Sequence, residues 1–146
     1  SSVLKKIFQV ISIVLVAFKI YLNMVIQWIT MIAMHTIVEL PEFLRKASNL
    51  LQESERLSMI KYLAIHPLSG DLLQGTGGIR KLRWSAKGKG KSGGVRVIYY
   101  YHNGSIPLFL LTVFGKGEKA NLSKSERNDL SKFTNLLLKN YGEKNE

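Results

Sequence analysis

Apolar positions divide the chain into an almost continuous apolar segment at the N-terminus and a longer region where short apolar runs alternate with polar residues. From Val3 to Ala33 the few polar residues recur at near-helical spacing, which predicts a helix with one narrow polar stripe. This leader, residues 1–33, is long enough to span a bilayer. Lys19 lies near its middle, and a lysine there costs on the order of a few kcal/mol on insertion scales. Hydropathy alone leaves the role of the leader open.

Three interpretations of the leader compete: a membrane anchor formed by residues 7–31, an amphipathic helix that packs on a partner, and translated upstream sequence that the native protein lacks. We favour the third, because the chain begins with Ser-Ser and Met24, Met31 and Met34 all precede the first globular-looking element. Lysines at positions 5 and 6 tend to stay in the cytoplasm, so a single span would carry the basic remainder of the chain outside the cell. We therefore expect a domain over residues 34–146 in the cytoplasm, with membrane association through residues 7–31 as the alternative.

The remainder of the chain reads as one α+β domain. Residues 35–40 predict a short strand, Pro41 opens a helix with apolar positions at helical spacing, and a second helix runs from Ser54 to about Ile65. A capping-box pattern at residues 123–126 opens a last helix. Three strands are expected between these helices, at residues 79–84, 95–101 and 108–114. The economical arrangement is a small antiparallel sheet, a meander, with two helices before it and one after.

The charge of the chain indicates that its partner is a polyanion. The chain has 21 Lys and Arg against 10 Asp and Glu, a net charge of +11. Seven of the basic residues lie between Arg80 and Arg96, among glycines and without any acidic residue. Such a segment favours nucleic acid or an acidic membrane surface. It could instead be a solvated, disordered linker, but the strands expected on either side argue against that.

The sequence has neither a reactive thiol nor a set of residues at the spacing of metal ligands. There is no cysteine, which excludes thiol catalysis, disulfides and thiolate metal sites. The three histidines are far apart and form no pair at ligand spacing. We therefore predict no metal site and no cofactor.

Alternation within the expected strands sorts the cations by face. Lys81 and Arg83 share one face, and the large apolar residues between and after them point to the core. Arg96 occupies the corresponding face of the next strand. The three cations are therefore expected to converge on one open sheet face. The alternative is that they are solvated charges, since antiparallel sheets commonly expose one face.

Three strings in the sequence resemble HigB toxins of the RelE superfamily. They are Q-G-T-G-G-I-R-K-L-R-W at 74–84, K-G-K-G-K-S-G-G-V-R-V-I-Y-Y at 87–100 and L-T-V-F-G-K-G-E-K at 111–119. The resemblance covers about residues 34–146. It implies the same α+β fold, and a toxin of a type II toxin–antitoxin module that cleaves mRNA, usually in the ribosomal A site. The implied partners are the ribosome, mRNA and a HigA-type antitoxin with a helix-turn-helix DNA-binding domain.

The resemblance also implies roles for individual residues. The K-x-K/R pair of the family falls on Lys81 and Arg83, and its strand arginine falls on Arg96. A further arginine and a tyrosine near the C-terminus of RelE have no direct counterpart here, where Gly117 follows Lys116. The residues expected to contact RNA or the ribosome are Arg80, Lys91, Phe114, Lys116 and Lys119, with the phenylalanine offering an aromatic surface to a base.

The implied chemistry needs neither metal nor cofactor. The 2′-hydroxyl of the mRNA attacks its adjacent phosphate, and arginines 83 and 96 stabilise the charge that develops. The general base must be a group that can lose a proton, and like-charge clustering makes lysine a candidate. Lys81, Lys87 and Lys89 all remain possible for this role. Two other functions stay open: an RNA-binding module without catalysis, and a membrane-tethered basic domain.

Overall fold

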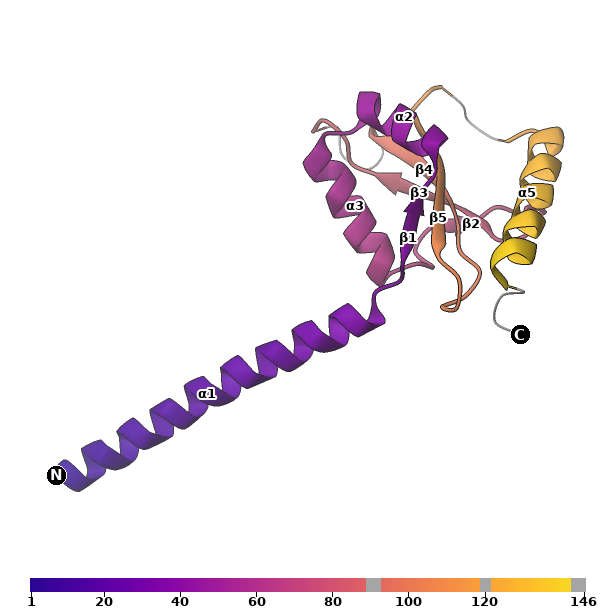
Figure 1. Cartoon of the computed structure of the whole chain (residues 1–146). Helices are drawn as coiled ribbons and strands as arrows, with labels where there is room; N and C mark the ends of the chain where they lie inside the picture. Colours follow the sequence, from indigo (N-terminus) through magenta and orange to yellow (C-terminus); the bar gives the residue numbers. More distant parts are fainter. Residues whose placement is uncertain (89–92, 119–121, 143–146) are drawn as a thin grey trace. The chain divides into compact units, whose positions relative to one another are not determined.

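The computed structural model describes residues 1–88, 93–118 and 122–142, apart from the side chains of residues 30, 32 and 33 (Figure 1). The chain divides into two compact units, Ser1–Met34 and His35–Glu146. The first contains α1, Ser2–Ala33, and the second has an α+β fold. The elements of the second unit are β1 (Ile37–Glu39), α2 (Pro41–Leu50), α3 (Glu53–Ile65), β2 (Asp71–Leu72), β3 (Ile79–Trp84), β4 (Val95–Tyr100), β5 (Leu108–Gly115) and α5 (Lys124–Gly142).

Helix α1 confirms the helix expected for the leader. Its N-terminus is capped by Ser1, whose hydroxyl accepts a hydrogen bond from the amide of Leu4 at 3.4 Å. By length and composition, the stretch from Ser2 to Ile29 could cross a membrane. Large apolar side chains along it are exposed within the described residues, for example Phe8 at 68% and Trp28 at 63%. Within the described residues, the helix therefore does not bury its apolar side chains in a core of its own.

The sheet of the second unit has five strands among the described residues, in the order β1-β5-β4-β3-β2. Strands β3, β4 and β5 form the expected antiparallel meander. The sheet as a whole is mixed, because β1 pairs with β5 in parallel, with Ile37 opposite Leu108. Parallel neighbours require a crossover connection, and here the crossover includes α2, α3 and the rest of the meander. The short β2 was not expected, since two residues carry no detectable periodicity.

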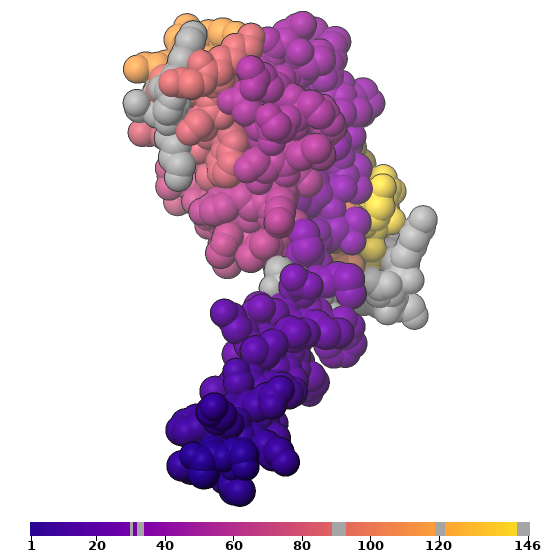
Figure 2. Space-filling model, turned by 90° about the vertical axis from the view of Figure 1, so that its left-hand side faces the viewer, coloured from indigo at the N-terminus to yellow at the C-terminus, as the bar shows by residue number. Residues whose placement is uncertain are grey.

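One face of the sheet is covered and the other is covered in part, which corrects the expectation of one open face. On one face, α2 and α3 pack on Leu82, Val97 and other apolar residues. Side chains of these two helices, purple to magenta, cover this side of the unit in Figure 2. On the other face a second core contains Ile98 and Tyr100, at 2% and 0% exposure, with Leu137 of α5. The apolar stripe of α5 is buried against the central part of this face.

Helix α5 is held by the glycine-rich turn before β3. Its predicted capping box is present: the amide of Glu126 donates to the Ser123 hydroxyl at 3.2 Å, and the amide of Ser123 donates to the Glu126 carboxylate at 3.4 Å. Further along, the buried hydroxyl of Thr134 lies 3.2 Å from the carbonyl oxygen of Thr76. Gly77 has φ +77, and a Cβ there would lie 2.7 Å from that hydroxyl. A side chain is therefore excluded at this position by both backbone strain and contact with α5.

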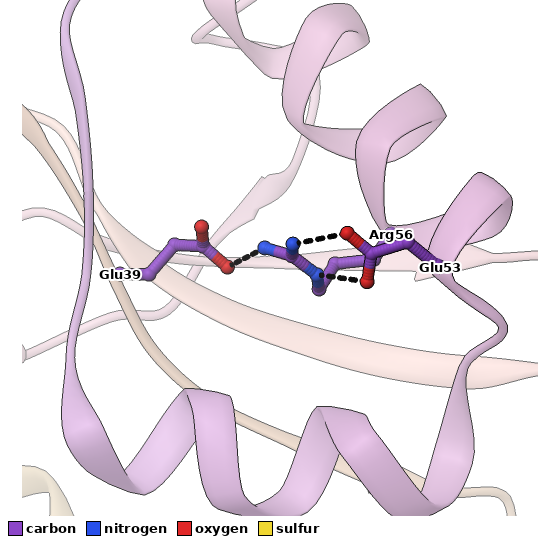
Figure 3. Close-up of polar contacts among 3 residues, drawn as sticks. All are labelled: Glu39, Glu53 and Arg56. Atoms are coloured by element: carbon purple, nitrogen blue, oxygen red, sulfur yellow. Dashed lines mark hydrogen bonds and ion pairs between the residues drawn. The ribbon is translucent and has the colours of Figure 1, made fainter.

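A partly buried charge network joins β1 to α3 (Figure 3). The guanidinium of Arg56 makes a two-pronged contact with the carboxylate of Glu53, at 2.7 and 3.2 Å. It also donates to Glu39 in β1. Hydrogen bonds to Glu53 first, and to Glu39 second, raise the pKa of Arg56. The two-pronged contact lies within α3 and holds the guanidinium in one orientation, and the contact with Glu39 then ties α3 to the edge strand.

Loss of the hydroxyl group should change the stability of the fold differently at two adjacent tyrosines of β4. The Tyr99 hydroxyl donates to the carbonyl of Pro67 at 2.8 Å and accepts from the amide of Gly70 at 2.9 Å, whereas the buried Tyr100 hydroxyl has no hydrogen-bond partner among the described residues. Tyr99→Phe should lower the free energy of unfolding by about 1–3 kcal/mol, because a buried amide loses its partner. Tyr100→Phe should be neutral or stabilising. Urea unfolding of both variants checks this, and equal destabilisation would contradict the assignment.

Candidate active site

Three cations lie on the sheet face that α5 partly covers. Arg83 of β3 is directly opposite Arg96 of β4. Lys81, two residues before Arg83 in β3, is opposite Ile98. Side chains alternate along a strand, so Lys81 and Arg83 share the face of the second core with Arg96. We call these three residues the cationic triad. The structure thus brings together the three positions that the sequence placed on one face.

Two like charges lie directly opposite each other in the triad, which is a physical reason to regard it as a site for an anion. Directly opposed residues in an antiparallel pair have Cβ atoms about 4.5–5.5 Å apart, and like charges there are destabilising. The Arg83 side chain is exposed, and Arg96 is half-buried, with its Nη1 donating to the carbonyl of Val95 at 3.3 Å. A bound anion would relieve the repulsion between the two guanidinium groups. Each guanidinium can also present two parallel N–H donors to a phosphate.

Two neighbours of the triad differ from expectation. Phe114 lies opposite Arg96 but is only 8% exposed, so its ring contributes to the second core instead of offering an open platform to a base. Asp71 of β2 lies opposite Lys81 and is exposed, which places a carboxylate beside the triad that sequence reasoning missed. No signal in the sequence could have shown it, since β2 has only two residues.

Arg80 lies on the opposite face of the sheet from the triad. Its Nη1 donates to the carbonyl oxygens of Gly70, at 2.9 Å, and Leu68, at 3.3 Å. Its Nε is buried and has no hydrogen-bond partner among the described residues. The guanidinium therefore holds the loop before β2, on the other face of the sheet from Lys81 and Arg83.

Lys87 is held on the α2 and α3 side of the sheet. Its Nζ donates to the carbonyl of Asn49 at 3.1 Å, and its backbone amide donates to the Glu55 carboxylate at 2.7 Å. The residue has φ +51, an uncommon backbone conformation for a non-glycine residue. With the exposed Lys116 it lines a hollow of about 240 Å³ that is also lined by Gly93 and two other glycines. The structure brings these two lysines together, but apart from the face of the triad.

The remaining predicted positions lie outside the described residues: Lys89, Lys91 and Lys119. Among the residues that are described, no group of three or more histidine, aspartate or glutamate side chains could hold a metal ion. The described site can supply charge stabilisation by two guanidinium groups, with an amine and a carboxylate nearby.

Comparison with known protein families places this site in context. Residues 43–145 match the family described as RelE toxin of the RelE/RelB toxin–antitoxin system. The match includes all three triad residues and most of the second unit, and the α+β fold agrees with it. It covers well over half of the chain. This chain belongs to the RelE toxin family.

Proposed function

We propose that residues 34–146 form a HigB-type toxin that cleaves mRNA on the ribosome without a metal ion. RelE toxins inhibit translation and are in general ribonucleases, which supports a nuclease function. The observation that carries the proposal for this chain is Arg83 directly opposite Arg96, with Lys81 on the same face. The HigB assignment rests on the sequence strings described above. The site belongs to the cytoplasm, where ribosomes and mRNA are found.

The reaction follows from the chemistry of RNA. The 2′-oxygen of a ribose bonds to the adjacent phosphorus while its proton passes to a base, and the bond to the 5′-oxygen of the next nucleotide breaks. The 5′-oxygen takes up a proton, and the products are a 2′,3′-cyclic phosphate and a 5′-hydroxyl. Negative charge builds up on the non-bridging oxygens as the fifth bond to phosphorus forms. Arg83 and Arg96 would stabilise that charge through preorganised N–H donors.

Lys81 is our proposed general base. It is on the same face as the two arginines, the face on which a phosphodiester would bind. The Nζ of Lys87 instead donates to the carbonyl of Asn49. Asp71, opposite Lys81, would hold the resulting ammonium group after proton transfer.

The remaining cations would bind ribosomal RNA through its phosphates. The chain carries +11, and the leader contributes three lysines and no acidic residue, so residues 34–146 retain +8. Contacts of this kind position a protein without reading bases and weaken as salt concentration rises. We further propose a HigA-type antitoxin, with a helix-turn-helix domain, as the partner that neutralises the toxin.

Dependence on translation tests the proposal. A chain beginning at Met34 is induced in cells, and RNA 5′ ends are mapped with and without an inhibitor that empties the ribosomal A site. We expect new ends inside translated reading frames and their loss when the inhibitor is present. Ends that persist without translation would contradict ribosome dependence. RNA binding without any new ends would favour a module without catalysis.

A further inference from the structure

The connection between β3 and β4 joins the two strands that carry the opposed arginines. Arg83 and Arg96 form the second pair from this connection, after Trp84 and Val95. The connection, residues 85–94, includes four glycines and is longer than a hairpin turn that sets strand register by its own geometry. Like charges directly opposite each other also weaken the strand pairing next to it. Contacts from elsewhere in the fold therefore have to hold this end of the hairpin.

Lys87 is the residue at which helices α2 and α3 hold this connection. Its backbone amide donates to one carboxylate oxygen of Glu55 at 2.7 Å, and the other oxygen accepts from the amide of Gln52 at 2.9 Å. Its Nζ donates to the carbonyl of Asn49, in the last turn of α2, at 3.1 Å. That contact is favourable because the last carbonyls of a helix have no partner within the helix. Lys87 is thus fixed between the end of α2 and the start of α3.

The backbone at this anchor is strained, which is a second reason to connect it with function. Lys87 has φ +51, and the next residue, Gly88, has φ +74. A residue with a side chain keeps such a conformation only where its surroundings over-determine it, and strain of this kind is concentrated at functional sites. At the other end of the connection, the carbonyl of Gly94 accepts from the amide of Lys116, which follows β5, at 3.3 Å. Both ends of the connection are therefore attached to other elements.

We propose that Glu55 is a positioning residue for RNA cleavage; the inference rests on the proposed function as a nuclease. Through the Lys87 amide, Glu55 holds the β3–β4 connection and so keeps the side chains of Arg83 and Arg96 aligned for one phosphate. Glu55 belongs to α3, which packs on the opposite face of the sheet from the triad, so it acts through the backbone and not on the RNA. A misplacement of about 1 Å in such a pair can lower a reaction rate about a hundredfold.

Two charge-matched variants test this role. Glu55→Ala removes the acceptor of the Lys87 amide, and Glu53→Ala removes a carboxylate from the same turn of α3, where its partner is Arg56 (Figure 3). On ribosomes that carry a short mRNA, with the toxin at saturation, Glu55→Ala should cleave about ten- to a hundredfold more slowly than Glu53→Ala. The toxin concentration for half the maximal rate should be the same in both, because neither carboxylate contacts RNA. Glu55→Gln keeps one acceptor oxygen and should recover part of the rate.

A double variant and hydrogen exchange identify the route. Adding Glu55→Ala to Arg83→Ala should lower the rate by a smaller factor than it does in the parent chain, because residues that act through each other are not additive. Equal factors in the two backgrounds would overturn the proposal, as would equal cleavage by Glu55→Ala and Glu53→Ala, or a loss of rate that follows loss of stability in urea. The Lys87 amide should exchange faster in Glu55→Ala alone, and unchanged exchange would also overturn the proposal. If the parent chain cleaves no RNA while this exchange rises, the nuclease is wrong and the anchor stands.

Discussion

Replacing Arg83 or Arg96 with alanine should lower the rate of mRNA cleavage about a hundred- to a thousandfold and relieve growth arrest. Each guanidinium supplies donors to oxygens that gain charge only in the transition state, so the loss falls on the chemical step. The two residues are directly opposite each other, so truncating one also removes a repulsion. For the exposed Arg83, the free energy of unfolding should therefore stay unchanged or rise by up to about 1 kcal/mol. Primer extension on a translated mRNA measures the first quantity, and urea unfolding the second.

Two further variants make this result specific. Arg96→Lys keeps the charge but loses the two-pronged contact, and should recover only part of the activity. Lys61→Ala removes one exposed cation from α3 and should cleave like the parent. If Lys61→Ala loses as much activity as Arg96→Ala, net charge explains the effect and the triad does not. Loss of activity in parallel with loss of stability would mean that the arginines are structural.

The position of the triad could be predicted because strand alternation is a local property. Lys81 and Arg83 are two residues apart, so any extended conformation places them on one face. Arg96 follows in the next strand of a meander, so it could be expected beside them, but its exact register opposite Arg83 was not predicted. The family resemblance added roles to these positions, which alternation alone could not do.

The surroundings of the triad could not be predicted, because they depend on contacts between distant parts of the chain. The Nζ of Lys87 binds the carbonyl of Asn49, 38 residues away, and nothing near either residue signals that bond. Phe114 is buried because α5 covers part of the sheet, and the extent of that cover depends on how Thr134 meets the turn at Gly77. Long-range packing of this kind decides whether a polar group faces solvent or contacts other parts of the protein. Sequence patterns therefore predicted which residues carry the chemistry better than they predicted which of those residues are accessible to solvent.

A chain beginning at Met34 should fold and arrest growth as strongly as any longer form. The described residues of both cores and the whole triad lie at positions 37 and beyond, and the two units separate at Met34. Large apolar side chains of α1 are exposed, so removing the leader should raise the soluble fraction of the protein. Growth after induction, the soluble fraction and urea unfolding compare the two chains. The Arg96→Ala version of the short chain is the matched control, since it should fold equally well without arresting growth.

The same comparison separates two interpretations of the leader, translated upstream sequence and a membrane anchor. If the short chain is soluble, folded and toxic, the leader is dispensable, as expected for translated upstream sequence. If full toxicity needs the leader and the full chain floats with membranes, residues 7–31 act as an anchor, because a helix of this length and composition could cross a bilayer. Full growth of cells that accumulate soluble, folded residues 34–146 would contradict the toxin function itself. A folded domain with the triad intact would then lack the one property that the proposal requires of it.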